Sequence, residues 1–277
     1  LLSAMFAIDV ASYAIMTNHY HVLVRVDLQK AATWSVQEII EHWSILFQIP
    51  DCIKLYLAGH LTLDDDIQCA NKMIEVYRER LSNISWFMRC LNEHIARLAN
   101  AEDKCTGRFW EGRFKSQAVL DEKSLINTMV YIDLNPIRAD LAKTPETSEY
   151  TSIAERISAR NLSTDLKCAF HGKLLPFMGG KGLADSPQIP FHLIDYVELV
   201  DWTGRQIRPQ KLGSISEHEP AILARLGIET CNWIQNCKAL EKEFHQVIGP
   251  AAAIERFCRT IGQKWLQGIH NCRRCFG

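Results

Sequence analysis

Alternating apolar and polar positions near the start of the chain predict a β-strand in the segment IMTNHYHVLVRV, residues 15–26. One face of this strand is apolar and is expected to pack on the core: Tyr20, Val22, Val24 and Val26. The other face carries mostly polar side chains: His19, His21, Leu23 and Arg25. On this pattern alone, His19 and His21 have two interpretations. They could ligate one divalent ion, but the favoured interpretation is that they are two polar residues on a solvent-exposed sheet face.

Helical periodicity dominates most of the remaining sequence. Apolar residues spaced by three and four predict a helix packed on the core over residues 84–98. Residues 27–80 are polar and broken, and we interpret them as a helical insertion. Residues 172–190 are rich in glycine and proline and predict a linker. With its flanking residues, this predicted linker covers residues 156–190. From residue 191 to residue 277, helical patterns ending at Gly249 and Gly268 predict a mostly helical accessory region.

A second alternating segment, CTGRFWEGRFKSQAVL at residues 105–120, also predicts a strand. Its basic residues Arg108, Arg113 and Lys115 are interleaved with aromatic side chains. Such a surface suits single-stranded nucleic acid, which binds through phosphate contacts and base stacking. Ordinary surface charge explains the same three residues equally well.

The segment DEKSLINTMVYIDLNPIRADL, residues 121–141, predicts a helix that starts at acidic residues and is bounded or kinked by Pro136. Asn127, Tyr131 and Asn135 recur every four residues and therefore share one face. Tyr131 is either a functional group on this face or a structural ring with a local hydrogen bond. Arg138 follows the proline and is placed to reach a phosphate or to cap the helix end.

Composition narrows the class of protein. The 277 residues are 47% hydrophobic and 23% charged, as in an ordinary soluble globular chain. The net charge of −1 and the pI near 6.9 exclude a global basic field, so nucleic-acid contacts would depend on local patches. Ten irregularly spaced cysteines favour reduced thiols. A run of apolar residues long enough to cross a membrane is absent from the sequence.

The candidate residues combine into one chemical hypothesis. A tyrosine hydroxyl such as that of Tyr131 can break a DNA phosphodiester and store the bond as a phosphotyrosine. His19 and His21 would hold a divalent ion that neutralises developing charge, and the Asn135 side chain would supply a third ligand. One helix face would then deliver both the nucleophile and a ligand.

The HYH strand, the segment GRFWEGRFKSQAVLDE and the segment YIDLNPIRADL resemble REP-associated tyrosine transposases, members of the HUH endonuclease superfamily. The resemblance spans roughly residues 5–155. It implies an α+β fold with a ferredoxin-like antiparallel sheet and packed helices, here as a domain over residues 1–155. It also implies Tyr131 as the catalytic nucleophile and His19, His21 and Asn135 as ligands of Mg²⁺ or Mn²⁺.

The same resemblance implies a function. The expected partner is hairpin-forming single-stranded DNA, contacted by Arg108, Arg113, Lys115 and Arg138, in the bacterial cytoplasm at the nucleoid. Insertion-sequence relatives are often dimeric, so a homodimer is one expected assembly. Family members begin with a further strand and helix, which predicts that this chain is an N-terminally truncated fragment. The alternatives are a catalytically inactive DNA-binding remnant and a replication initiator or relaxase, the latter disfavoured by the absence of a second nearby tyrosine or a longer histidine cluster.

Overall fold

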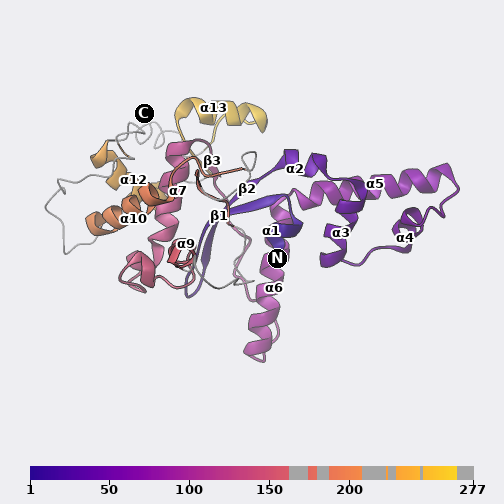
Figure 1. Ribbon diagram of the computed structural model, residues 1–277, viewed down its shortest axis with the longest axis horizontal. Helices are drawn as coiled ribbons and strands as arrows, with labels where there is room; N and C mark the ends of the chain where they lie inside the picture. Colours follow the sequence, from indigo (N-terminus) through magenta and orange to yellow (C-terminus); the bar gives the residue numbers. More distant parts are fainter. Residues whose placement is uncertain (162–173, 180–186, 208–222, 224–228, 244–245, 267–277) are drawn as a thin grey trace. The chain divides into compact units, whose positions relative to one another are not determined.

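The computed structural model describes residues 1–161, 174–179, 187–207, 223, 229–243 and 246–266 (Figure 1). The fold class is α+β: helices predominate, and the described strands form two small two-stranded sheets. The chain divides into two compact units. Unit 1 holds Leu1–Val10 and Val24–Phe114, and unit 2 holds Ala11–Leu23 and Lys115–Gly277. This division differs from the predicted one, which placed a single domain over residues 1–155.

Strands β1, Ile8–Ile15, and β2, Tyr20–Val26, pair as a hairpin. The far end of the hairpin, around the turn, belongs to unit 2, and its open end belongs to unit 1. The predicted strand at residues 15–26 is therefore confirmed, except that it begins at Tyr20. The predicted sidedness is wrong, because Val26 is exposed while Leu23, on the histidine face, packs against the hydrophobic clusters of unit 2.

Unit 1 is built from six helices: α1 Leu2–Met5, α2 Leu28–Thr33, α3 Val36–Leu46, α4 Asp51–Leu57, α5 Asp64–Leu81 and α6 Ile84–Glu102. The predicted helical insertion and the predicted helix at residues 84–98 are both confirmed. Helix α3 starts at a capping box in which Ser35 and Glu38 bind each other's backbone N–H. Helix α5 starts with the acidic run Asp64–Asp66, which complements the positive end of the helix dipole.

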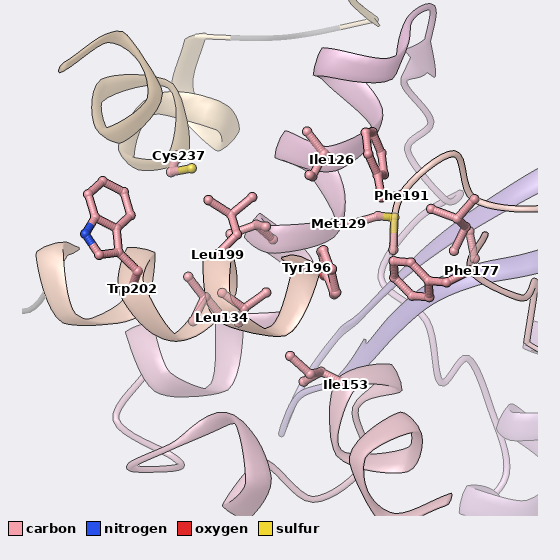
Figure 2. Packing of buried hydrophobic residues seen from close by; sticks show 14 of the residues in the cluster. Ile126, Met129, Leu134, Ile153, Phe177, Phe191, Tyr196, Leu199, Trp202 and Cys237 are labelled. Carbon is pink, nitrogen blue, oxygen red and sulfur yellow. The ribbon is translucent and has the colours of Figure 1, made fainter. Parts of the chain in front are cut away.

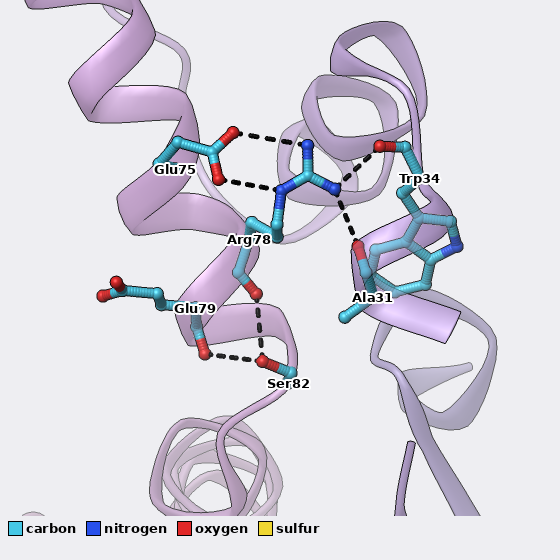
Figure 3. A network of polar contacts seen from close by, with 6 residues as sticks. All are labelled: Ala31, Trp34, Glu75, Arg78, Glu79 and Ser82. Atoms are coloured by element: carbon cyan, nitrogen blue, oxygen red, sulfur yellow. Dashed lines mark hydrogen bonds and ion pairs between the residues drawn. The ribbon is translucent and has the colours of Figure 1, made fainter. Parts of the chain in front are cut away.

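A half-buried arginine fixes the end of α2 in unit 1 (Figure 3). Arg78 Nη1 donates hydrogen bonds of 2.7 Å to the carbonyl oxygens of both Ala31 and Trp34, while Glu75 accepts from its Nε at 2.9 Å. The last carbonyls of a helix have no partner within the helix, so this contact satisfies two of them. It also links α5 to α2 across more than forty residues of sequence.

Unit 2 surrounds helix α7, Glu122–Asp133, which is buried along most of its length. Its other elements are β3 Ala118–Val119, α8 Asn135–Arg138, the 3-10 turn Pro145–Thr147, α9 Ser152–Asn161, α10 Leu193–Ile207, α12 Thr230–Glu243, β4 Val247–Ile248 and α13 Ala251–Thr260. Figure 2 shows the core between α7 and α10, which includes Ile126, Met129, Tyr196 and Leu199. The helix predicted from residue 121 is confirmed, and α7 ends before Pro136 as expected.

Three predictions of secondary structure are wrong. Residues 105–117 form no strand, and only Ala118–Val119 does, paired in parallel with β4. The predicted linker, residues 156–190, begins within helix α9, and its described residues include three core side chains, Leu175, Phe177 and Ile189; residues 162–173 and 180–186 lie outside the described residues. Gly249 does not end a helix, because β4 lies between it and α12. The other predicted helix stop, Gly268, lies outside the described residues.

A ferredoxin-like sheet is not formed among the described residues, which hold only the β1–β2 hairpin and the short β3–β4 pair. Within the same ranges, no helix is both long enough and apolar enough to cross a membrane.

Candidate functional site

The hairpin of unit 2 places two imidazoles next to each other. The turn is closed by the N–H of Met16, which donates to the carbonyl of His19 at 2.9 Å. His19 stands just before β2 and is exposed, whereas His21 lies on β2 and is half-buried. Their ring centroids are 5.0 Å apart with the rings edge to face, so the two histidines meet as the period of two predicts.

Helix α7 brings Tyr131 against this pair. The helix starts at Asp121, whose side chain accepts a 2.9 Å hydrogen bond from the N–H of Ser124. The Tyr131 ring centroid lies 5.6 Å from that of His21, with an interplanar angle of 78°. Tyr131 is only 6% exposed and belongs to a hydrophobic cluster with Ile132. Two segments that are 110 residues apart in sequence therefore form one contact.

Arg138 covers the Tyr131 ring. Its guanidinium carbon lies 4.8 Å from the ring centroid, a cation–π arrangement. The same guanidinium donates to the carbonyl of Cys237 at 3.4 Å, and the residue is nevertheless exposed to solvent. A positive charge is thus held beside the phenol at the surface of unit 2, where a phosphate can reach it.

Asn135 starts helix α8, directly after the bend at Leu134 that separates α7 from α8. The residue is half-buried, and its Nδ2 atom is buried with no hydrogen-bond partner among the described residues. An amide left unpaired in this way is costly and points to a missing partner. Because the nitrogen and oxygen of an asparagine exchange by a flip of the side chain, either atom can take that position.

Asp133, which lies between Tyr131 and Asn135 in the sequence, carries a buried carboxylate that the sequence analysis did not single out. Asp133 is fully buried and accepts hydrogen bonds from the Ser152 hydroxyl at 2.7 Å and from the Ile153 N–H at 3.2 Å. Its other oxygen accepts from the Tyr196 hydroxyl. Burial raises the pKa of the Asp133 carboxyl to about 6, against the effect of these hydrogen bonds.

The Asp133 cluster also connects α7 to the histidine hairpin. The Ser152 hydroxyl lies 3.0 Å from that of Ser12 and accepts a hydrogen bond of the same length from the N–H of Tyr13, both on β1. Arg156 adds a bond of 2.9 Å to the carbonyl of Ala11, also on β1. The strand that leads into the histidine turn is thereby tied to the helix that carries Tyr131. Sequence offered one signal for this cluster, a charged residue within an otherwise apolar helix face.

The remaining predicted DNA contacts are all exposed but differ in location. Lys115 belongs to unit 2, whereas Arg108 and Arg113 belong to unit 1. Arg108 folds back to donate a 2.9 Å bond to the carbonyl of Trp110. Because residues 105–117 are not a strand, the alternation that grouped the three side chains does not apply, and their role stays a prediction.

Imidazole nitrogens and an amide oxygen can ligate a divalent ion, so the residue types of His19, His21 and Asn135 are compatible with a metal site. No group of three or more His, Cys, Asp or Glu side chains able to hold a metal occurs in the part of the chain that the structure describes. A site here would therefore need the Asn135 amide beside His19 and His21. Imidazole nitrogens favour a transition ion, so this set suits Mn²⁺ better than Mg²⁺.

Comparisons of the chain with protein-family models, with curated proteins and with solved structures find no match.

Proposed function

We propose that unit 2 carries the active site of a DNA transposase that cleaves and rejoins hairpin-forming single-stranded DNA through a 5′-phosphotyrosine on Tyr131. The proposal rests on the resemblance to REP-associated tyrosine transposases and on one observation in particular. The rings of His19, His21 and Tyr131 form a continuous chain of contacts, with centroid separations of 5.0 and 5.6 Å. Both the histidine segment and the Tyr131 segment belong to the resemblance. Nothing in either segment alone requires their side chains to come into contact.

The proposed chemistry is a pair of balanced transesterifications. The Tyr131 oxygen forms a bond to phosphorus, the bond from phosphorus to the 3′ oxygen breaks, and that oxygen leaves as a 3′ hydroxyl. The phenol proton passes to water, and a proton from water goes to the leaving oxygen. Attack by a 3′ hydroxyl on the phosphotyrosine reverses the sequence and joins the DNA. No external energy source is required, because one phosphoester replaces another.

The protein groups around Tyr131 have distinct roles in this proposal. His19, His21 and Asn135 would hold Mn²⁺ or Mg²⁺, which when bound neutralises charge on the phosphate. Arg138 packs on the ring and fixes its orientation, and its exposed guanidinium can bind a phosphate oxygen. Asp133 has a structural role, because its hydrogen bond to Ser152 connects α7 to β1.

A ferredoxin-like sheet, a dimer and a nucleoid location are further parts of this proposal that derive from the resemblance. The β1–β2 hairpin with α7 packed on its histidine face supplies one strand pair and one helix for such a core.

The wild-type chain is expected to form a covalent adduct with a labelled DNA hairpin that has single-stranded flanks, in the presence of Mn²⁺. The adduct should resist boiling in detergent, disappear after protease treatment and fail to form with a chelator. Its absence at all tested hairpin sequences, with binding to the hairpin retained on a native gel, would contradict the enzymatic proposal.

Metal binding can be measured without activity. The electron paramagnetic resonance signal of free Mn²⁺ is expected to fall when wild-type protein is added, and His21→Gln should weaken this binding by at least about tenfold because one imidazole is lost. His94→Gln is a matched control, since His94 is exposed on α6 in unit 1. Equal Mn²⁺ binding by the two variants would exclude the histidine pair as the site.

A catalytically inactive DNA-binding remnant is the second candidate, and one observation favours it. Tyr131 is 6% exposed, so little of its surface meets solvent. In this alternative the aromatic contacts of Tyr131 are structural and the basic side chains alone hold DNA. Retardation of the hairpin without an adduct is the result that this candidate predicts.

A further inference from the structure

The segment 251–266 lies beyond the part of the chain that resembles transposases, yet it packs in the same hydrophobic cluster as Tyr131. Ile254, Cys258 and Leu266 are buried there with Tyr131 and Ile132. Helix α13 therefore has one apolar face, which is turned toward the hydrophobic cluster of the candidate site.

Backbone pairing holds this segment in place. Strand β4, just before α13, pairs in parallel with β3, just before α7, with Ala118 opposite Val247 and Val119 opposite Ile248. The N–H of Ala118 donates to the carbonyl of Gln246 at 2.8 Å, and that of Leu120 donates to Ile248 at 3.1 Å. Helices α7 and α13 thus start from adjacent strands of one small sheet (Figure 1).

The outward side of the segment carries three cations, one acidic residue, Glu255, and an exposed indole. Arg256, Arg259 and Lys264 are exposed, and none has a carboxylate within ion-pair distance among the described residues. Trp265 is 68% exposed. Arg25, Arg78 and Arg205, in contrast, each contact an acidic side chain.

Two simpler explanations account for part of this surface. A basic residue in the last turn, such as Arg259, favours the negative end of the helix dipole. Scattered exposed apolar residues are normal. Neither explains why three unpaired cations and an indole occur within ten residues on the outer side of an element whose inner side packs with Tyr131.

We infer that this outer side, defined by Arg256, Arg259, Lys264 and Trp265, is a binding surface for the single-stranded flank of the DNA substrate. The inference deepens the proposed function and rests on it for the identity of the ligand. The cations neutralise successive phosphates, and the Trp265 indole stacks on a base. Unpaired bases offer their faces for stacking, whereas bases within a duplex do not, so the surface selects single strands.

The test measures binding in a Tyr131→Phe background, so that cleavage does not enter. The probes are a fluorescein-labelled hairpin with a single-stranded flank and a blunt duplex, each followed by anisotropy over a range of KCl concentrations. Removing three phosphate contacts with Arg256→Gln, Arg259→Gln and Lys264→Gln together is expected to reduce the salt slope for the flanked hairpin by about 2. Trp265→Ala should weaken binding of this probe by at least about fivefold with little change in slope.

A triple variant with Lys54→Gln, Lys72→Gln and Arg97→Gln is the control matched in charge and exposure, because these exposed cations lie on helices of unit 1. Lys54 and Arg97 differ from the α13 cations in that each has a carboxylate partner. Equal slopes for the two triple variants would overturn the inference, as would an unchanged affinity of Trp265→Ala or an equal loss of duplex binding. Melting temperatures near that of the parent protein exclude unfolding as the cause. If the α13 variants behave as expected but the protein with Tyr131 forms no adduct, the DNA surface stands and the catalytic proposal fails.

Discussion

Tyr131→Phe is expected to reduce covalent attachment to hairpin DNA by at least about a thousandfold, because the variant lacks the only oxygen that the proposed reaction joins to phosphorus. The substitution keeps the aromatic ring. The contact with His21, the cation–π contact with Arg138 and the packing in the hydrophobic cluster all involve that ring. The adduct is measured by denaturing electrophoresis of labelled DNA at several times, with Mn²⁺ present.

Tyr150→Phe is the matched control for this prediction. Tyr150 lies in the same unit and is 69% exposed, so its hydroxyl can be removed without disturbing a core. This variant should form the adduct at the wild-type rate. An adduct that persists in Tyr131→Phe but is lost in Tyr150→Phe would show that Tyr150 is the nucleophile and would contradict the proposal. DNA affinity should be similar in all three proteins.

Asp133→Ala is expected to lower the free energy of unfolding by about 3 kcal/mol at pH 5. The substitution removes the acceptor for the Tyr196 hydroxyl and the Ile153 N–H, and the Ser152 hydroxyl keeps only its contacts with β1. It also leaves a small cavity on α7. Urea unfolding followed by near-ultraviolet circular dichroism measures the change. Asp201→Ala, on the surface of α10, removes only an exposed ion pair with Arg205 and should cost less than about 1 kcal/mol.

The same residue makes stability depend on pH. The folded-state pKa of Asp133 is about 6, above the value of about 3.9 for an unfolded chain, so the folded protein binds the proton more tightly. The contribution of Asp133 to stability is then fully present below about pH 4 and declines by roughly 3 kcal/mol as the pH rises past 6. Asp133→Asn should flatten this part of the curve. A wild-type stability that rises between pH 4 and pH 6, with no difference between the two proteins, would contradict the assignment.

Sequence predicted the parts of the fold that depend on local pattern. The helix from Asp121 to the bend before Pro136 follows from a capping side chain, an apolar stripe and a missing N–H, all of which act within a few residues. The contact of His21 with Tyr131 was expected through the resemblance and is present in unit 2. No local sequence pattern predicts where the Asn135 side chain lies relative to His19 and His21.

Features that depend on distant partners escaped prediction. Alternation over residues 105–117 describes side chains, but a strand also needs a neighbour for its backbone, and Gly107 takes a φ of +131° that interrupts an extended run. Asp133 is recognisable as important only when Tyr196 and Ser152 are brought to it. Leu175 and Phe177 read as linker because glycine and proline surround them, yet they are buried in the core of unit 2.

The pairing of β3 with β4 has a consequence for how the protein is made. Ala118 precedes its partner Val247 by more than a hundred residues, so this contact closes only after most of the chain has left the ribosome. Helix α7 emerges early, yet β3, immediately before it, lacks a backbone partner until β4 follows. In a domain that folds from its N-terminal side during synthesis, the region around Tyr131 would reach its final packing late, when Ile254 and Cys258 arrive. Under the proposed function, the site around Tyr131 would be complete only after the α13 segment had been translated.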